Sequence, residues 1–473
     1  MKFRHSPIAF ILVLLASCAS APTARDAAQA RTDHVATDTR GVAGVSSAQL
    51  EPEYWIGRAT QPQAMVLDDA QIDAQNQRLQ QLDHSVHDIE ALPSTLGREQ
   101  VKGWIQGLSK RPASTRYDIG GREIKTPVFD ALVADLRIEA IAATQSTRYG
   151  MVTQRADLRT FPTHLRVFSR AGDTDIDRFQ ENALFPGTPV VIAHESRDGK
   201  WWFIVSHLYA AWIEKKYVAE GNKQSVFAYT RKTPSLIVSG ATARTVHTPE
   251  APQVSDLQLE MGVRVPVLAG WPSDQPVNGQ HPYTAHVIEL PVRAGDGALR
   301  FVPALLPRTA DVSADYLPLT RGNIVRQGFK FLGERYGWGH DYNARDCSGF
   351  VSEVYRSFGV ELPRNTSDQS VSPALNRMAF DADDSARKRS DAMRALQVGD
   401  LVYIPGHVMM VIGHDNGVPY VIHDTNGGAW RGPAGTLVSG KLNGVAVTPL
   451  TTLMFNETQT YVDRITNIQR IRP

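Results

Sequence analysis

Cysteine is almost missing from this sequence: 473 residues contain two, Cys18 and Cys347. So few thiols exclude the disulfide-rich class of small exported domains. The metal and phosphate motifs Cys-x-x-Cys, His-Glu-x-x-His and the Walker loop are also missing. Charge of one sign is lacking too, with 50 Lys and Arg against 49 Asp and Glu, whereas a nucleic-acid binder carries a strong basic bias. We therefore expect no metal, no cofactor and no nucleic-acid partner.

The one long apolar run lies at the start and is too short for a stable membrane span. The basic stretch MKFRH, the apolar stretch IAFILVLLA and the small residues that follow are typical of a secretory signal over residues 1–17. The signal ends in Leu-Ala-Ser-Cys18, which resembles the bacterial lipobox, and this resemblance implies that Cys18 is lipidated. Ordinary cleavage near Ala21 is the alternative. Residues 18–48 hold few large apolar groups and are expected to form a lipid-anchored flexible tether.

The rest of the chain is long enough for two to four domains. Residues 49–150 are predicted to be mainly helical, with Asp68 or Asp69 as an N-cap. Short strand-like runs between Gly, Pro and Asp turns then predict two small β-barrels in tandem, over 151–234 and 235–318. SRDGKWW contains an Asp-Gly hairpin signal. Residues 319–473 begin with helices and continue with strands, which indicates an α+β domain.

The second cysteine, Cys347, lies at the start of a predicted helix. One apolar helical face ends near Gly359 and is made by Phe350, Val351, Val354, Tyr355 and Phe358. Asp346 is a natural N-cap, so Cys347 lies in the first turn. The helix dipole and the free amides there are expected to stabilise a thiolate and lower its pKa. The alternative is a buried, inert cysteine packed as a small apolar residue.

Two histidines could assist this thiol, because a nucleophilic cysteine needs a base and a group that orients the base. His407 begins the strand-like run HVMMVIG, and His423 ends the run PYVIHD. A two-residue Asn-Gly turn between them would put the histidines on opposite faces. A three-residue Asp-Asn-Gly loop puts His423 opposite Met409, and diagonal neighbours on one face are about 7–8 Å apart.

We predict the second register, with His407 as base and His423 as orienting group. Strand-end histidines that face solvent are the alternative. His414, in the turn, is expected to be a solvated bystander.

With these residues in view, residues 319–473 resemble the NlpC/p60 family of papain-like cysteine peptidases. The resemblance rests on RYGWGHDYNARDCSGFV, VGDLVYIPGHVMMVIG and YVIHD. Upstream, SRDGKWWFIVSHLYAAWI and YLPLTRGNIVRQGFKFLGERYGWG look like a multidomain lipoprotein subgroup with a helical N-terminal clip and two bacterial SH3-like barrels. The implied fold class is a multidomain chain with an α+β papain-like C-terminal domain behind these parts.

The resemblance implies a cell-wall endopeptidase that cuts peptidoglycan stem peptides between γ-D-glutamate and the diamino acid, meso-diaminopimelate or L-lysine. It implies a catalytic triad of Cys347, His407 and His423. Asp346, Ser348 and Tyr336 match motif positions near the substrate, which implies that they bind the free amine of the terminal L-alanine together with the first barrel. Asp346 serves equally well as a helix cap, and Tyr336 as a packing residue.

Several alternatives stay open. The chain could be a non-catalytic murein-binding scaffold lipoprotein, or a papain-like amidase or acyltransferase. The barrels either bind the wall or restrict the cleft, and we favour restriction because no flexible linker lies near Thr320. We expect a monomer that binds stem peptides or muropeptides and is held at the membrane by its lipid, on the periplasmic face of the outer membrane in a Gram-negative cell.

Overall fold

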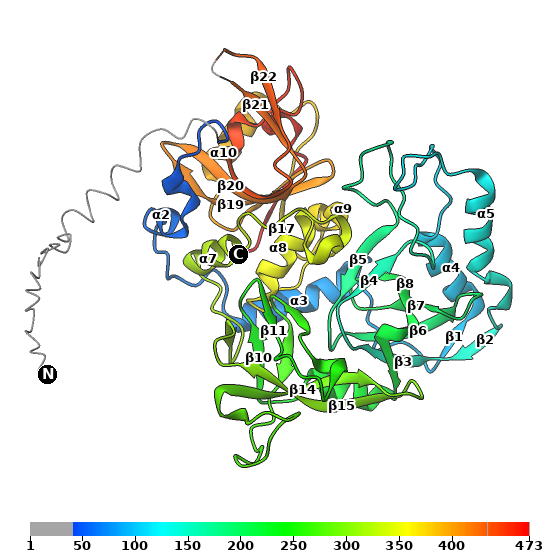
Figure 1. Cartoon of the computed structure of the whole chain (residues 1–473). Helices are drawn as coiled ribbons and strands as arrows, with labels where there is room; N and C mark the ends of the chain where they lie inside the picture. The colour runs from blue at the N-terminus through cyan, green and yellow to red at the C-terminus, as the bar shows by residue number, and fades with distance from the viewer. Residues whose placement is uncertain (1–40, 433, 473) are drawn as a thin grey trace, which may run out of the picture.

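The computed structural model describes residues 41–432 and 434–472. The predicted signal, the lipidation of Cys18 and the tether as far as residue 40 lie outside these residues and stay predictions. Figure 1 shows three lobes that meet around helix α8 (Cys347–Arg356): the C-terminal domain (319–472), the first barrel (148–221) and the second barrel (235–313). In the described part of the chain, no helix combines the length and the apolar character needed to cross a membrane.

The region between residues 49 and 150 is mainly helical, but its helices pack on two different lobes. Its elements are α2 (Pro52–Ile56), α3 (Asp69–Leu82), α4 (Arg98–Leu108) and α5 (Thr126–Asp135), with the paired strands β1 (Thr95–Gly97) and β2 (Thr144–Ser146). Helix α3 begins at the predicted cap, where the Asp68 carboxylate accepts the Gln71 amide at 2.9 Å.

Trp55, Ile56 and Ile72 join the core of the C-terminal domain, whereas Val101 and Ile105 join the core of the first barrel. Residues 49–150, which the sequence assigns to one helical domain, are therefore divided between two neighbours.

The first barrel is a seven-stranded antiparallel sheet in the order β5-β4-β8-β7-β6-β3-β9. Its strands are β3 (Arg148–Val152), β4 (Ala156–Arg159), β5 (Gln180–Leu184), β6 (Pro189–Glu195), β7 (Trp201–Val205), β8 (Ala210–Glu214) and β9 (Val218–Gly221), followed by α6 (Lys223–Thr230). The predicted Asp-Gly hairpin is confirmed: β6 pairs with β7, and Gly199 takes a positive φ of 69° in the turn.

The second barrel consists of smaller antiparallel pieces. Strand β10 (Ser235–Val238) lies between β13 (Arg264–Pro266) and β16 (Val312–Ser313), β11 (Thr242–Arg244) pairs with β12 (Gln258–Glu260), and β14 (Ala285–Arg293) pairs with β15 (Leu299–Pro307). Its core also takes in Ala183 and Phe185 of the first barrel. The two barrels are thus packed against each other directly.

The C-terminal domain is an antiparallel sheet with helices on both faces, and its first helices precede its strands, as predicted for an α+β domain. The six strands run in the order β17 (Asn376–Ala379), β24 (Asn467–Arg470), β18 (Leu401–Ile404), β19 (His407–Asp415), β20 (Val418–Thr425) and β23 (Gly444–Pro449). Helices α7 (Arg321–Phe329) and α8 pack on the face that carries Val408 and Met410. Helix α10 (Ala386–Ala395) packs on the opposite face, which carries Met409 and Val411. The remaining elements are α9 (Thr366–Val371) and the hairpin of β21 (Gly428–Arg431) with β22 (Leu437–Gly440).

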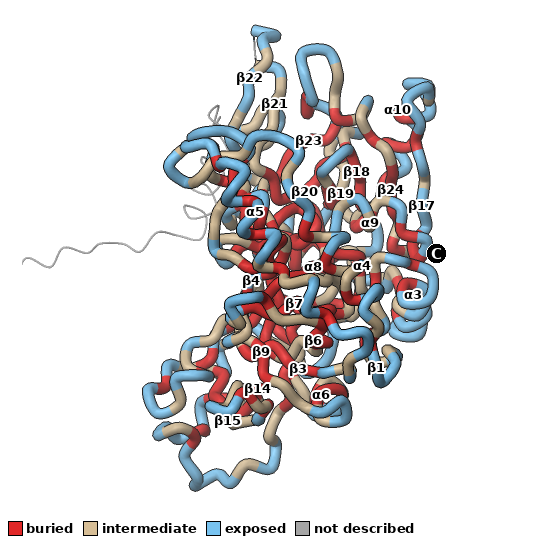
Figure 2. Tube along the Cα trace, turned by 90° about the vertical axis from the view of Figure 1, so that its right-hand side faces the viewer, coloured by how far each residue is buried: buried red, intermediate tan, exposed pale blue. Residues whose placement is uncertain are grey.

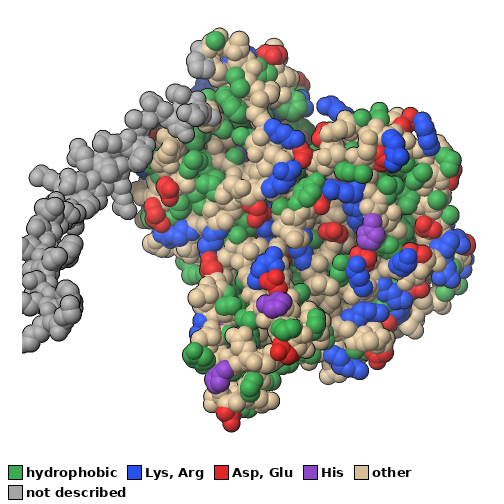
Figure 3. Space-filling model, viewed as in Figure 1, with side chains coloured by type: hydrophobic (Ala, Val, Ile, Leu, Met, Phe, Trp, Pro, Cys, Tyr) green, Lys and Arg blue, Asp and Glu red, His purple; other side chains and the backbone are tan. Residues whose placement is uncertain are grey.

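Buried residues continue from the first barrel into the C-terminal domain. Figure 2 shows buried segments running from β3, β6 and β7 of the first barrel to α8. On the face in Figure 3, acidic and basic side chains are interspersed, in keeping with the net charge of +1. The active-site helix predicted from the sequence therefore lies at a junction of three lobes and not at the rim of one.

An N-terminal arm, residues 44–56, clasps the β19–β20 hairpin. The Tyr420 hydroxyl donates to the Gly44 carbonyl at 2.6 Å, and Gln49 donates to the Asp415 carboxylate at 2.9 Å. Trp55 lies against Tyr420 with ring centroids 4.9 Å apart, and its indole N–H donates to the Gln49 carbonyl at 2.8 Å. The predicted tether to residue 48 is therefore shorter than expected, because the chain already packs on the C-terminal domain from Gly44 onward.

Replacing Trp55 by alanine should strongly lower the unfolding free energy, because Trp55 packs the N-terminal arm on the C-terminal domain. Trp55 is 1% exposed, and truncation of a buried aromatic residue costs about 3–5 kcal/mol of unfolding free energy. Leu50→Ala is the matched control, since Leu50 is 42% exposed and exposed positions change stability by about 0.5 kcal/mol or less. Urea titration measures both variants, and equal unfolding midpoints would contradict the packing described here.

Candidate active site

Cys347 is the first residue of α8, as predicted. The Asp346 carboxylate accepts the Gly349 amide at 2.8 Å and so caps the helix. The apolar face predicted for this helix is buried in the core of the C-terminal domain. This packing fixes the first turn, and with it the position of the thiol.

The thiol itself is held in its neutral form, which corrects the prediction of a lowered pKa. Burial raises the pKa of Cys347 to about 12, and the Asp346 carboxylate adds to the rise. The Thr366 hydroxyl, 3.5 Å from Sγ, and the Val408 amide act in the opposite direction on this pKa without reversing it. The helix end favours a thiolate, but Cys347 is only 5% exposed, and the loss of water around its side chain outweighs that effect.

The two histidines are brought together by a bulge that was not predicted from the sequence. Strands β19 and β20 join through a two-residue turn, in which Asn416 and Gly417 have φ of 49° and 79°. The predicted three-residue loop is therefore wrong. The register slips by one residue between Val411 and Gly413, so that Met410 faces Ile422. Counting on from that pair puts His423 opposite Met409, as predicted.

The result of this register is a direct bond between imidazoles. His407 Nε2 lies 2.7 Å from His423 Nδ1, and His423 Nε2 lies 3.0 Å from the Thr448 hydroxyl. Burial lowers the pKa of His407 to about 4, and it also lowers that of His423. Both rings are therefore neutral near pH 7, and each carries one proton. His414, expected to be a solvated bystander, is half-buried at the other end of β19 and contacts the Met393 carbonyl at 3.1 Å.

Asp346 is the centre of a buried polar network. Arg364 donates to both of its oxygens, at 2.8 and 3.1 Å, and the Ser348 hydroxyl donates to one of them at 3.2 Å. Arg364 and His340 hold the pKa of Asp346 down at about 2 against the opposing effect of burial. Asp346 is therefore ionised under ordinary conditions, and as the cap of α8 it is already engaged by the protein.

A cavity of about 400 Å³ opens beside the thiol. It is lined from the C-terminal domain by the predicted residues Tyr336, Asp346, Cys347 and Ser348, together with Trp338, Arg364, Asn365, Thr366, Ser367, Ser370, Ile404, Pro405, Gly406 and Thr466. The first barrel closes it with Gln180, Glu181 and Tyr209. The β18–β19 turn that ends at His407 thus borders the same space as Cys347. Among the side chains that the structure describes, no group of three or more His, Cys, Asp or Glu is placed to hold a metal ion.

Several of these residues were not found from the sequence. Glu181 accepts the Tyr209 hydroxyl at 2.6 Å and also the Thr160 hydroxyl. Neither Glu181 nor Arg364 stands out by spacing, because each reaches the site through tertiary packing. Thr448 lies on β23, where one threonine in a strand carries no signal of its own.

Comparison with known proteins agrees with this architecture. Residues 333–430 match the NlpC/P60 family, and residues 166–214 match the SH3 domain of SH3b1 type. The Gamma-D-glutamyl-L-lysine dipeptidyl-peptidase of Bacillus cereus is 25% identical over 285 residues, which cover 56% of this chain and 74% of that protein. The probable endopeptidase p60 of Listeria seeligeri is 30% identical over 120 residues, 23% of this chain and 20% of that protein.

A solved NlpC/P60 endopeptidase from Photobacterium damselae subsp. piscicida superposes with a TM-score of 0.67 at 16% identity, over 86% of this chain and 93% of that one. This likeness shows a shared fold. These matches confirm the predicted multidomain fold class, in which SH3-like β-structure precedes a papain-like α+β C-terminal domain.

The resting thiol should react slowly with iodoacetamide near neutral pH. With its pKa raised to about 12, the thiolate fraction rises about tenfold per pH unit, so the alkylation rate should climb from pH 7 to 10 without a plateau. A Cys18→Ala chain leaves Cys347 as the sole thiol, and the same chain unfolded in urea should level off above its ordinary pKa of about 8.5. A rate that is already flat between pH 5 and 8 would instead show a preformed thiolate.

Proposed function

We propose that this chain, which carries an SH3b domain and an NlpC/P60 domain, is a cysteine endopeptidase of peptidoglycan stem peptides. The proposed bond is the one between γ-D-glutamate and the diamino acid. The observation that carries the proposal is the hydrogen-bonded series His407–His423–Thr448. It begins at the residue next to Val408, whose backbone amide contacts the buried thiol at the N-terminus of α8. The name of the Bacillus cereus relative supports the choice of bond.

The tautomers of His407 and His423 follow from the proposed role of His407 as the base that accepts the thiol proton. His407 accepts the thiol proton only if its Nδ1 is unprotonated, so its Nε2–H donates to His423 Nδ1. His423 then carries its proton on Nε2 and donates to the Thr448 hydroxyl oxygen. This arrangement orients His407 and stabilises the positive charge that it gains during the reaction.

In the reaction, the thiol gives its proton to His407 as Sγ attacks the γ-carbonyl carbon of D-glutamate. The tetrahedral oxyanion is stabilised by amides at the start of α8. Collapse breaks the C–N bond, and His407 returns the proton to the leaving amine of the diamino acid. Water then attacks the thioester carbon while His407 takes a proton from it. Collapse breaks the C–S bond, His407 gives that proton to the departing sulfur, and the thiol is restored as the acid product leaves. Proton transfer accompanies attack because thiol and imidazole are both neutral at rest.

The side of the cavity that the first barrel lines suits the ammonium group of a terminal L-alanine. Two carboxylates face this space, Asp346 of the C-terminal domain and Glu181 of the first barrel. Asp346 is already engaged by Arg364. Burial raises the pKa of Glu181, and an ammonium group that binds beside this carboxyl would favour the charged form of Glu181. We assign the amine contact chiefly to Glu181, with Ser348 and Tyr336 beside it, and this contact would restrict the enzyme to peptides with a free amino end.

Replacing the nucleophile should stop turnover without loss of the fold. Cys347→Ala and His407→Ala should each lower kcat on L-Ala-γ-D-Glu-diamino-acid tripeptides by more than about 10⁴-fold. His414→Ala, on the same strand, is the matched control and should keep most of the activity. Mass analysis should find L-Ala-γ-D-Glu and the free diamino acid. Undiminished turnover by Cys347→Ala would refute the proposal. Acyl-transfer or amidase products would show that the chain is an acyltransferase or an amidase instead of an endopeptidase.

Removing the Glu181 charge should weaken selection for a free amine. Glu181→Gln should raise KM for the free tripeptide roughly tenfold or more, since a charged hydrogen bond contributes about 1.5–3 kcal/mol. The N-acetylated tripeptide should be a poor substrate for the parent enzyme and should not change further in the variant. Glu195→Gln, elsewhere in the first barrel, is the control. Equal cleavage of free and acetylated peptides by the parent enzyme would contradict this assignment.

A further inference from the structure

The segment just before Cys347 is a left-handed loop, residues 339–343. Gly339, His340, Tyr342 and Asn343 all have positive φ, of 58°, 65°, 61° and 56°. Three of these are not glycine, and each such residue costs on the order of 1–3 kcal/mol unless its surroundings hold it in place. The loop therefore needs an external support.

That support comes from Arg155 of the first barrel. Its Nη2 donates to the His340 carbonyl at 2.9 Å and to the Ala344 carbonyl at 3.0 Å, near the two ends of the loop. Its Nε pairs with the Glu260 carboxylate of the second barrel at 2.7 Å. The Arg155 side chain is 8% exposed and that of Glu260 is fully buried, so water does not compete for these contacts. A single guanidinium thus joins all three lobes.

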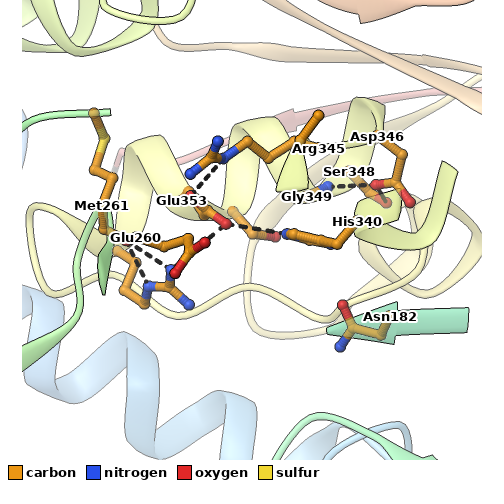
Figure 4. A network of polar contacts seen from close by, with 12 residues as sticks. Asn182, Glu260, Met261, His340, Arg345, Asp346, Ser348, Gly349 and Glu353 are labelled. Carbon is orange, nitrogen blue, oxygen red and sulfur yellow. Dashed lines mark hydrogen bonds and ion pairs between the residues drawn. The ribbon is translucent and has the colours of Figure 1, made fainter. Parts of the chain in front are cut away.

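The loop in turn touches the active-site helix. A Cβ added to Gly349 would lie 2.4 Å from His340 Cε1, so the ring is pressed against the first turn of α8. Figure 4 shows His340 pointing to Glu353, which Arg345 also reaches; the two bonds measure 3.0 and 2.8 Å. The Gly339 amide donates to the Asp346 carboxylate at 3.0 Å. A shift of the loop would therefore shift both the cap and the first turn that carry Cys347.

We propose that Arg155 is a positioning residue for catalysis, which acts on Cys347 through the left-handed loop. The barrels then do more than narrow the cleft: their docking completes the active site. Arg155 does not line the cavity, so its effect should fall on kcat and spare KM. The inference rests on the proposed function where turnover of the tripeptide is measured. It does not rest on that function where the alkylation rate of Cys347 is measured.

The test compares full-length Arg155→Ala and Arg155→Lys with Arg148→Ala. Arg148 belongs to the same barrel and forms an exposed ion pair with Glu220. Arg155→Ala should lower kcat on the tripeptide about 10- to 100-fold, as a misplacement near 1 Å does, and leave KM within about twofold. Lysine keeps the charge but cannot reproduce the planar guanidinium fork. The kcat of Arg155→Lys should therefore lie between that of the parent chain and that of Arg155→Ala. Millimolar guanidinium should restore part of the kcat of Arg155→Ala only.

Iodoacetamide gives the readout that does not depend on turnover. Loosening the loop should expose Cys347 and speed its alkylation at pH 8 about tenfold in Arg155→Ala, with no change in Arg148→Ala. If the parent chain cleaves no tripeptide, the proposed function fails while alkylation still tests Arg155. Parent-like kcat and alkylation in a folded Arg155→Ala would overturn the inference, even if its unfolding midpoint fell. If that variant does not fold, Arg155→Lys decides by the same two measurements.

Discussion

The hydrogen bond between His407 and His423, 2.7 Å long, is the interaction on which the rest of this site depends. It engages Nε2 of His407 and leaves Nδ1 as the nitrogen that could accept a proton, and it requires both strands to present their histidines on one face. The register that does so is made by a bulge at the far end of the hairpin. The N-terminal arm lies on that bulge, since a Cβ at Gly413 would lie 3.1 Å from Trp55. Residues distant from the two imidazoles thus contribute to the register that brings His407 and His423 together.

A second constraint is the amount of charge enclosed around α8. Asp346, Glu353, Arg345 and Arg364 are all buried, and buried charges are tolerated only when they are paired. Arg364 pairs with Asp346, and Arg345 pairs with Glu353, within the C-terminal domain. Other hydrogen bonds of these arginines cross lobe boundaries: Arg364 donates to the Asn182 side chain of the first barrel at 2.6 Å, and Arg345 donates to the Ala241 carbonyl beside β11 at 3.0 Å. These hydrogen bonds tie the segments on either side of α8 to both barrels.

The parts predicted well from the sequence are those set by local rules. The cap at Asp346, the apolar face of α8 and the Asp-Gly hairpin follow from spacing within a few residues. The parts predicted poorly depend on distant partners. Nothing near Ile412 marks a bulge, and nothing links Arg155 to Glu260, which lie 105 residues apart in the chain. The prediction of a lowered thiol pKa failed for the same reason, because the burial of Cys347 in the folded chain cannot be seen in the segment that carries it.

The most direct test of this account is the protonation of the two rings. Nitrogen-15 NMR of histidine-labelled enzyme, assigned with His407→Gln and His423→Gln, distinguishes protonated from unprotonated ring nitrogens at pH 7. The account predicts two neutral rings, with the proton on Nε2 in both and His407 Nδ1 unprotonated. An imidazolium at His407, or a proton on its Nδ1 in the resting enzyme, would contradict it.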